Sequence, residues 1–246
     1  GVHRAHHAEA IGDLRGVRLA GDGGLLRQPP TGRHDALRHL ALSEHVRFFF
    51  YGQQLSLQRE CLIRDPGLHE TRFRDRERSI PALVELMTRQ YEDRQGNYLA
   101  FFSSFDYLEQ AAGEFSARHP RIPTWQQTRR MGEAEREGFL ARFTVNGCGV
   151  GFAVLGGSFA EGIDLAGTRL IGAFIATLGL PQFNPVNEEL RRRLDTEFGA
   201  GYDYAYLFPG IRKVVQAAGR VIRTLTDCGV LHLIDDRFAR PEVRRL

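Results

Sequence analysis

Four short, continuous apolar runs constrain the fold most, because segments with helical spacing lie between them. Runs of this length are typical of strands that are buried on both faces of a parallel sheet. Strands that alternate with helices from about residue 79 onward predict an α/β sandwich with a mainly parallel sheet. The runs are Tyr98–Phe102, Gly151–Leu155, Leu170–Ala176 and Val230–Ile234.

Helix signals fill the intervals between these runs. Ser79 is expected to cap a helix that continues through Met87. Ser104 precedes a second helix, which starts at Phe105 and stops before the His119-Pro120 pair. Other expected elements are strands at 46–51 and 122–125, and helices at 133–143, around 188–193 and after residue 210.

The basic residues exclude one common nucleotide site. Lys213 is the only lysine among 246 residues, and the other 32 basic residues are arginines. A P-loop needs a lysine in G-x-x-x-x-G-K-[ST], but Lys213 stands between Arg212 and Val214. The chain therefore lacks its own P-loop. A Rossmann-like metabolic enzyme also lacks support, because no G-x-G-x-x-G follows a strand and opens a helix.

The domain prediction divides the chain into two parts. Residues 1–68 are left unassigned, because they hold six of the nine histidines and little apolar periodicity; a truncated or out-of-frame stretch would explain them. Residues 69–246 are expected to form one domain.

The three cysteines are isolated, so neither a disulfide framework nor a metal site is expected. No apolar run is long enough to span a bilayer, so we expect a cytoplasmic chain without a membrane partner.

Two motifs carry the candidate chemistry. The segment 216–223 reads Q-x-x-G-R-x-x-R, which places two guanidiniums on one face if it is helical. Planar cations beside an amide suit a phosphate that gains charge during transfer. The segment 156–164 follows the second apolar run and contains three glycines, which let backbone amides approach a ligand, and acceptors at Glu161 and Asp164. The alternatives are an amphipathic helix with surface arginines and a tight loop at a strand exit.

From Arg72 to its end, the chain resembles the second RecA-like motor domain of DinG/XPD-like superfamily 2 DNA helicases. Residues 157–164 resemble helicase motif V and residues 216–223 resemble motif VI, in the right order. Residues 97–105 resemble motif IV, and residues 72–79 also match. The resemblance implies a RecA-like, P-loop NTPase-type three-layer sandwich, and it makes residues 69–246 the helicase C-terminal RecA-like domain 2.

The resemblance also implies roles for single residues. Arg220 and Arg223 would be the catalytic arginine finger, which stabilises charge on the γ-phosphate of ATP. For Ser103 and Ser104, which are among the expected DNA-binding residues, a helix N-cap remains the alternative. The residues for ATP binding and coupling would be Gln216, Gly219, Glu161, Gly162 and Asp164, and those for DNA binding would be Ser103, Ser104, Gly157 and Ser158.

The implied parent protein is an ATP-dependent DNA helicase that couples hydrolysis to translocation on single-stranded DNA and to duplex unwinding, 5′ to 3′, in DNA repair. ATP and Mg²⁺ would be held mainly by the first motor domain, which would be a partner within the same protein. Any iron–sulfur cluster would belong to that domain as well. The isolated chain is expected to be inactive. The competing interpretation is a non-catalytic nucleic-acid-binding remnant or interaction module.

Two further features have open interpretations. The Asp235-Asp236-Arg237 segment could bind a metal, but a turn with a local ion pair is favoured because the segment follows the last strand. Tyr202, Tyr204 and Tyr206 alternate along the chain, which fits one side of a strand or a surface that stacks on bases.

Overall fold

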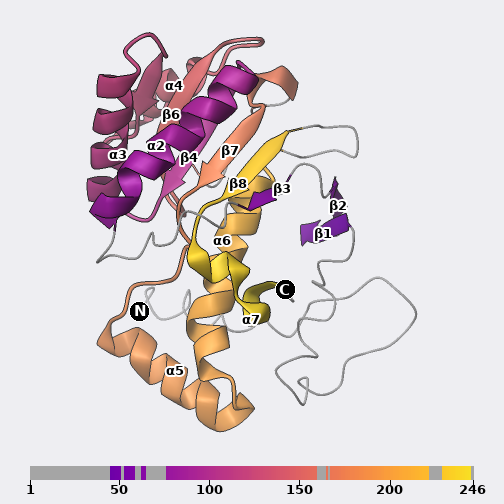
Figure 1. Cartoon of the computed structure of the whole chain (residues 1–246). Helices are drawn as coiled ribbons and strands as arrows, with labels where there is room; N and C mark the ends of the chain where they lie inside the picture. Colours follow the sequence, from indigo (N-terminus) through magenta and orange to yellow (C-terminus); the bar gives the residue numbers. More distant parts are fainter. Residues whose placement is uncertain are drawn as a thin grey trace.

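The computed structural model describes residues 76–159, 165, 167–221 and 229–244, and the backbone of three strands at 45–50, 53–58 and 62–64. Within this part, six strands form one sheet in the order β3-β8-β7-β4-β6-β5, and every neighbouring pair is parallel (Figure 1). The expected parallel sheet is therefore confirmed. The strands are β3 (Leu62–Arg64), β4 (Asn97–Phe102), β5 (Thr124–Gln126), β6 (Gly149–Val154), β7 (Gly172–Ile175) and β8 (Val230–Leu233).

Helices pack against both faces of this sheet and make it a three-layer sandwich, as expected. The buried side chains of α2 (Arg76–Asp93) and α3 (Phe105–Arg118) belong to a core on one face. Those of α4 (Glu133–Ala141) and α6 (Phe208–Ala218) belong to a core on the other face. A further helix, α5 (Pro185–Phe198), has no buried residue and lies beyond one end of the sheet (Figure 1).

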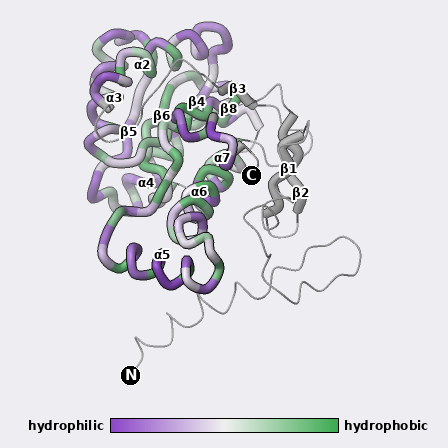
Figure 2. The backbone as a smooth tube through the Cα atoms, turned by 60° about the horizontal axis from the view of Figure 1, so that its bottom comes forward, coloured by the Kyte–Doolittle hydropathy of each residue, from purple (hydrophilic) through white to green (hydrophobic). Residues whose placement is uncertain are grey.

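The central strand shows why a continuous apolar run forms a buried strand here. Leu99 and Phe101 join the core that includes α6, and Tyr98 and Phe102 join the core that includes α2 and α3. Side chains of a strand alternate between its faces, so a strand covered on both faces must be apolar at every position. Figure 2 shows hydrophobic colour along the interior strands and hydrophilic colour along much of α5.

Two buried polar side chains fix neighbouring elements to the sheet. Asn97 donates hydrogen bonds to the carbonyls of Thr144 (2.8 Å) and Arg169 (3.0 Å). His232 on β8 hydrogen-bonds through Nε2 to the amide oxygen of Gln90 on α2 at 2.8 Å. A buried polar group is costly without such a partner, so these contacts specify how the loops and α2 sit on the strands.

The first helix corrects one prediction. It begins at Arg76 rather than at Ser79, so Ser79 lies inside the helix and is not its cap. Its hydroxyl is buried and lies 2.9 Å from the hydroxyl of Tyr107 on α3. Residues inside a helix can use a hydroxyl for tertiary contacts, and a contact across 28 residues cannot be read from local spacing.

Five shorter elements lie before α2 or after β8. The expected strand near residue 46 is present as β1 (His45–Phe50), which pairs antiparallel with β2 (Gln53–Gln58). β3 pairs with β8, so the sheet includes residues ahead of position 69. The domain division at that position stays a prediction. At the end of the chain, η6 (Asp236–Ala239) and α7 (Pro241–Arg244) follow β8.

Candidate functional site

The carboxyl ends of β4 and β6 place two expected DNA-binding segments side by side. The backbone N–H of Leu155 donates to the carbonyl of Phe102 at 2.8 Å, directly beyond the paired strands. Ser103 therefore lies next to the turn that starts at Gly156. The strand order reverses at β4, with β5 and β6 on one side and β7 and β8 on the other. Open parallel sheets bind ligands at the carboxyl ends of strands at such a point.

The two serines after β4 have different environments. Ser104 is the N-cap of α3, and its hydroxyl accepts a hydrogen bond from the backbone N–H of Tyr107 at 3.3 Å, which confirms the N-cap alternative. The hydroxyl oxygen of Ser103 is buried and has no hydrogen-bond partner in the structure as described. A buried unpaired hydroxyl is costly, so Ser103 has capacity to bind an external ligand. A role of either serine in DNA binding stays a prediction.

The turn after β6 packs against α6 through a lysine. Gly156 has φ +77°, in the left-handed region that favours glycine. A Cβ at this position would lie 2.9 Å from Cδ of Lys213, so the lysine stem passes directly over the glycine. Lys213 is half-buried and makes no hydrogen bond or ion pair with any described residue. Gly157 closes the turn with a 3.2 Å hydrogen bond to the carbonyl of Val154, and Ser158 is exposed.

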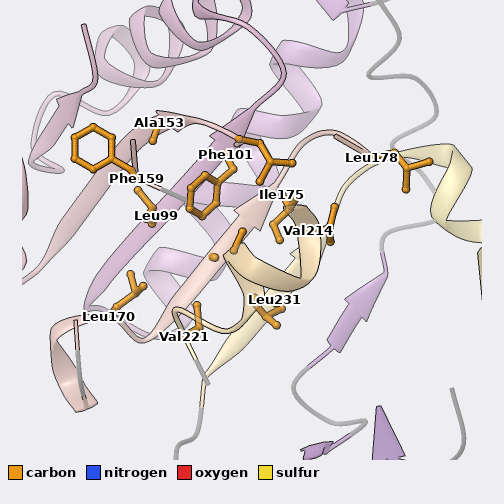
Figure 3. Packing of buried hydrophobic residues seen from close by; sticks show 14 of the residues in the cluster. Leu99, Phe101, Ala153, Phe159, Leu170, Ile175, Leu178, Val214, Val221 and Leu231 are labelled. Carbon is orange, nitrogen blue, oxygen red and sulfur yellow. The ribbon is translucent and has the colours of Figure 1, made fainter. Parts of the chain in front are cut away.

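Helix α6 runs antiparallel to β7 and β8 and connects the two ends of the sheet. At its start, a Cβ on Gly210 would lie 2.7 Å from the carbonyl oxygen of Leu178, just beyond the carboxyl end of β7. After its end, Val221 packs against Gly229, which immediately precedes β8. Figure 3 shows the same arrangement, with Leu178 at one end of the core and Val221 and Leu170 at the other. The glycine turn and the Gln216–Arg220 segment therefore lie toward opposite ends of α6.

The end of α6 changes the expected geometry of the arginines. The helix stops at Ala218, and Gly219 is its C-cap with an ordinary right-handed φ of −65°. Arg220 lies in the following turn, where its backbone N–H donates to Ala217 at 3.1 Å. Arg220 therefore lies outside α6, and a shared face with Arg223, which is outside the described residues, stays a prediction. Gln216, in the last turn of α6, and Arg220 are both half-exposed, so both side chains are accessible.

The remaining predicted site residues of these motifs lie outside the part of the chain that the structure describes. They concern the acceptors and glycine of the motif V-like loop and the second arginine of the motif VI-like segment. Their expected roles stay predictions. The residues are Glu161, Gly162, Asp164 and Arg223.

A buried ion pair holds the turn after β8. The sequence favoured such a turn with a local ion pair at Asp235-Asp236-Arg237. The carboxylate of Asp235 accepts from the backbone N–H of Arg237 at 3.0 Å and from its guanidinium at 2.7 and 2.6 Å. The Asp235 side chain is fully buried and the Arg237 side chain is 17% exposed. Burial opposes the charge of Arg237, but the hydrogen bond and charge of Asp235 outweigh it and raise the arginine pKa. Among the described residues, no three His, Cys, Asp or Glu side chains gather in a metal-binding group.

The three alternating tyrosines do not form a strand. They lie in and next to η5 (Asp203–Leu207), a π-helical turn that runs directly into α6. Tyr204 packs on Phe198 and Phe208, and Tyr206 packs on Phe183 and Tyr202. The strand interpretation is therefore wrong, and the aromatic rings attach α5 to the start of α6.

Sequence reasoning missed two residues at this site. Lys213 served only to exclude a P-loop, and its position over Gly156 depends on how α6 crosses the sheet. Phe183 lies in a polar, proline-containing connection, where no periodicity marks it. Its exposure and its aromatic partner appear only in the folded chain.

The fold and the site define a RecA-like α/β domain that carries candidate phosphate-binding groups but no P-loop. A family model described as the helicase C-terminal domain matches residues 87–246. This match spans more than half of the chain, so the chain belongs to the helicase C-terminal domain family.

Relatives and solved structures agree with this assignment. The chain is 30% identical over 148 residues to the ATP-dependent DNA helicase chl-1 of Caenorhabditis elegans, a match that covers 58% of this chain and 16% of that protein. It is 29% identical over 182 residues to a probable ATP-dependent helicase of Methanocaldococcus jannaschii, covering 68% and 27%. The chain thus spans about a quarter or less of these relatives.

A solved structure titled as an apo XPD shares the fold. It superimposes with a TM-score of 0.60 at 17% identity, over 75% of this chain and 37% of that structure. At this identity, the likeness supports the RecA-like fold alone. In the part of the chain that the structure describes, no helix is both long and apolar enough to cross a membrane.

Proposed function

We propose that this chain is the second motor domain of an ATP-dependent DNA helicase that translocates on single-stranded DNA. The main support for this proposal is the arrangement of the candidate residues along α6. Gln216 and Arg220 lie at the carboxyl end, Ser103 and the glycine turn lie toward the start, and Lys213, in the middle of the helix, reaches the glycine turn with its side chain. One rigid helix between a nucleotide-facing group and a DNA-facing group is a route by which hydrolysis can be coupled to movement along a strand.

The described residues fit a nucleotide held by another domain better than one held by this chain alone. A guanidinium and an amide are donors that complement phosphate oxygens, and they would contact the γ-phosphate of ATP. Arg220 would stabilise the charge that develops there, and Gln216 would orient the phosphate. ATP with Mg²⁺ would supply the phosphoanhydride and the divalent charge. The first motor domain would supply the principal binding loop.

The DNA-facing group fits the sugar–phosphate backbone. Lys213 carries a positive charge with no acidic partner among the described residues, and its stem lies over the adjacent glycine turn. Ser103 adds a hydroxyl with unused hydrogen-bonding capacity. Contacts of this kind bind phosphates without regard to sequence, as a translocating enzyme requires. The 5′ to 3′ polarity, the role in DNA repair and the cytoplasmic location rest on the family resemblance alone.

The direct test compares the chain alone with the chain combined with its first motor domain. Steady-state ATP turnover is measured with and without single-stranded DNA. We expect no DNA-stimulated turnover by the chain alone, because it lacks a P-loop, and stimulated turnover by the combination. If the combination binds single-stranded DNA but never hydrolyses ATP, the remnant or interaction module becomes the better interpretation.

A further inference from the structure

An aromatic stack stands at the connection between β7 and α5. Phe183 directly precedes Asn184, the N-cap of α5, and its side chain is 71% exposed. Its ring lies on that of Tyr206, with centroids 4.7 Å apart and planes within 9° of parallel. One face of Phe183 is therefore backed by a second ring, and the residue presents a large apolar surface to solvent.

The backing ring is held firmly. Tyr206 is fully buried, and its hydroxyl donates a 2.7 Å hydrogen bond to the carboxylate of Glu188 on α5. Burial and this contact raise the pKa of Tyr206 to about 12, so the hydroxyl stays a donor at neutral pH. Tyr202, which is 40% exposed, packs on the same ring at 5.5 Å. A fixed ring beneath Phe183 lowers the conformational entropy that Phe183 loses when a ligand stacks on it.

The backbone below the stack is irregular. Within the π-helical turn, the N–H of Phe208 bonds to the carbonyl of Asp203, five residues earlier. Such turns are rare and occur frequently at functional sites. Here the turn places Tyr206 under Phe183 and Tyr204 against a different set of rings.

The stack lies on the same side of the sheet as the proposed DNA-facing group. Residues 176–184 leave the carboxyl end of β7, and Leu178 and Leu180 in this segment pack on Gly210 at the start of α6. Figure 1 shows α5 beyond that end of the sheet. Phe183 and the proposed DNA-facing group therefore both lie beyond the carboxyl ends of the parallel strands.

The charges nearby favour a nucleic acid over a protein partner. Arg212 and Lys213 follow Tyr206 by six and seven residues and have no acidic partner among the described residues. The two acids in the first half of α5 are paired with arginines of the same helix, as in Glu188–Arg191 and Glu189–Arg193, whereas Asp195 and Glu197 near its carboxyl end have no arginine partner among the described residues. An exposed flat ring, together with cations on the next helix that have no acidic partner among the described residues, matches a base and its phosphates.

We propose that Phe183 is a stacking residue for a nucleobase of the single strand. The inference rests on the proposed function and adds a residue of base contact to it. A ring has no donors or acceptors, so this contact tolerates every base, which suits movement along a strand. The stack formed by Phe183 and Tyr206 would hold the strand in place while Lys213 contacts its phosphates.

Fluorescence anisotropy of the full 246-residue chain with oligo(dT) tests the contact. Because removal of Phe183 uncovers Tyr206, both Phe183→Ala and Phe183→Asp are measured. We expect Phe183→Ala to weaken binding about tenfold and Phe183→Asp to weaken it more, while Phe183→Tyr keeps wild-type affinity. An otherwise identical abasic strand should bind the wild-type chain and Phe183→Ala equally well.

Val186→Ala is the matched control, because Val186 is an apolar residue in the first turn of α5, three residues after Phe183, that is 77% exposed but has no ring. It should leave affinity unchanged, and far-UV circular dichroism should show that every variant is folded. Unchanged oligo(dT) binding by Phe183→Asp overturns the inference, and so does equal weakening on the abasic strand or by Val186→Ala. A wild-type chain that binds neither strand, even when combined with the first motor domain, contradicts the proposed function itself.

Discussion

Single residues show most clearly the cost of burying charge in this domain. Asp235 and Arg237 form a two-pronged ion pair beside the last strand, with the carboxylate fully buried. Removing one partner of such a pair leaves the other charge without compensation, which is more damaging than losing an exposed pair.

We therefore expect Asp235→Ala to lower the free energy of unfolding by about 3 kcal/mol. The control is Glu85→Ala, which removes an ion pair to Arg89 whose side chains are 57% and 72% exposed. That change should cost less than about 1 kcal/mol, because water screens exposed charges. Urea unfolding of both variants gives the comparison. Equal losses in the two would show that the buried pair has no special role.

At the scale of elements, α6 and the segments at its two ends position the candidate site residues. The apolar runs predicted the central strands well, because a strand covered on both faces must be apolar at each position. The π-helical turn was not predicted, since the alternation of Tyr202, Tyr204 and Tyr206 has the period of a strand. Its helical form depends on packing against α5 and Phe183. Likewise, no local pattern places Lys213 over Gly156 or ends α6 before Arg220.

The position of Lys213 on α6 leads to a prediction about salt. If its ammonium group neutralises a DNA phosphate, Lys213→Gln should weaken oligo(dT) binding and lower the slope of log affinity against log salt by about 0.7. Arg121→Gln, a change at an exposed arginine in the loop after α3, is the control and should leave the slope unchanged. Binding isotherms at a series of salt concentrations measure both. A wild-type slope for Lys213→Gln would remove this residue from the proposed DNA contacts.

At the scale of the whole molecule, we propose that the chain supplies half of an active site. While the motif assignments stay predictions, the fold class could be predicted from sequence, and the match to the helicase C-terminal domain family supports it. The separation of the two groups toward opposite ends of α6 could not, because it depends on the direction in which a helix crosses a sheet. The half-exposed side chains of Gln216 and Arg220 lie beside Val221, which packs at the amino end of β8.

The central claim is that Arg220 acts on a nucleotide held by the first motor domain. Its most direct test is DNA-stimulated ATP turnover by the two domains combined, with Arg220→Ala against Arg121→Ala. We predict a loss of about 10³-fold or more in turnover for Arg220→Ala, as for other arginine fingers, with single-strand binding retained. Arg121→Ala should keep full turnover. Undiminished, DNA-stimulated hydrolysis by Arg220→Ala would show that Arg220 does not act on the nucleotide.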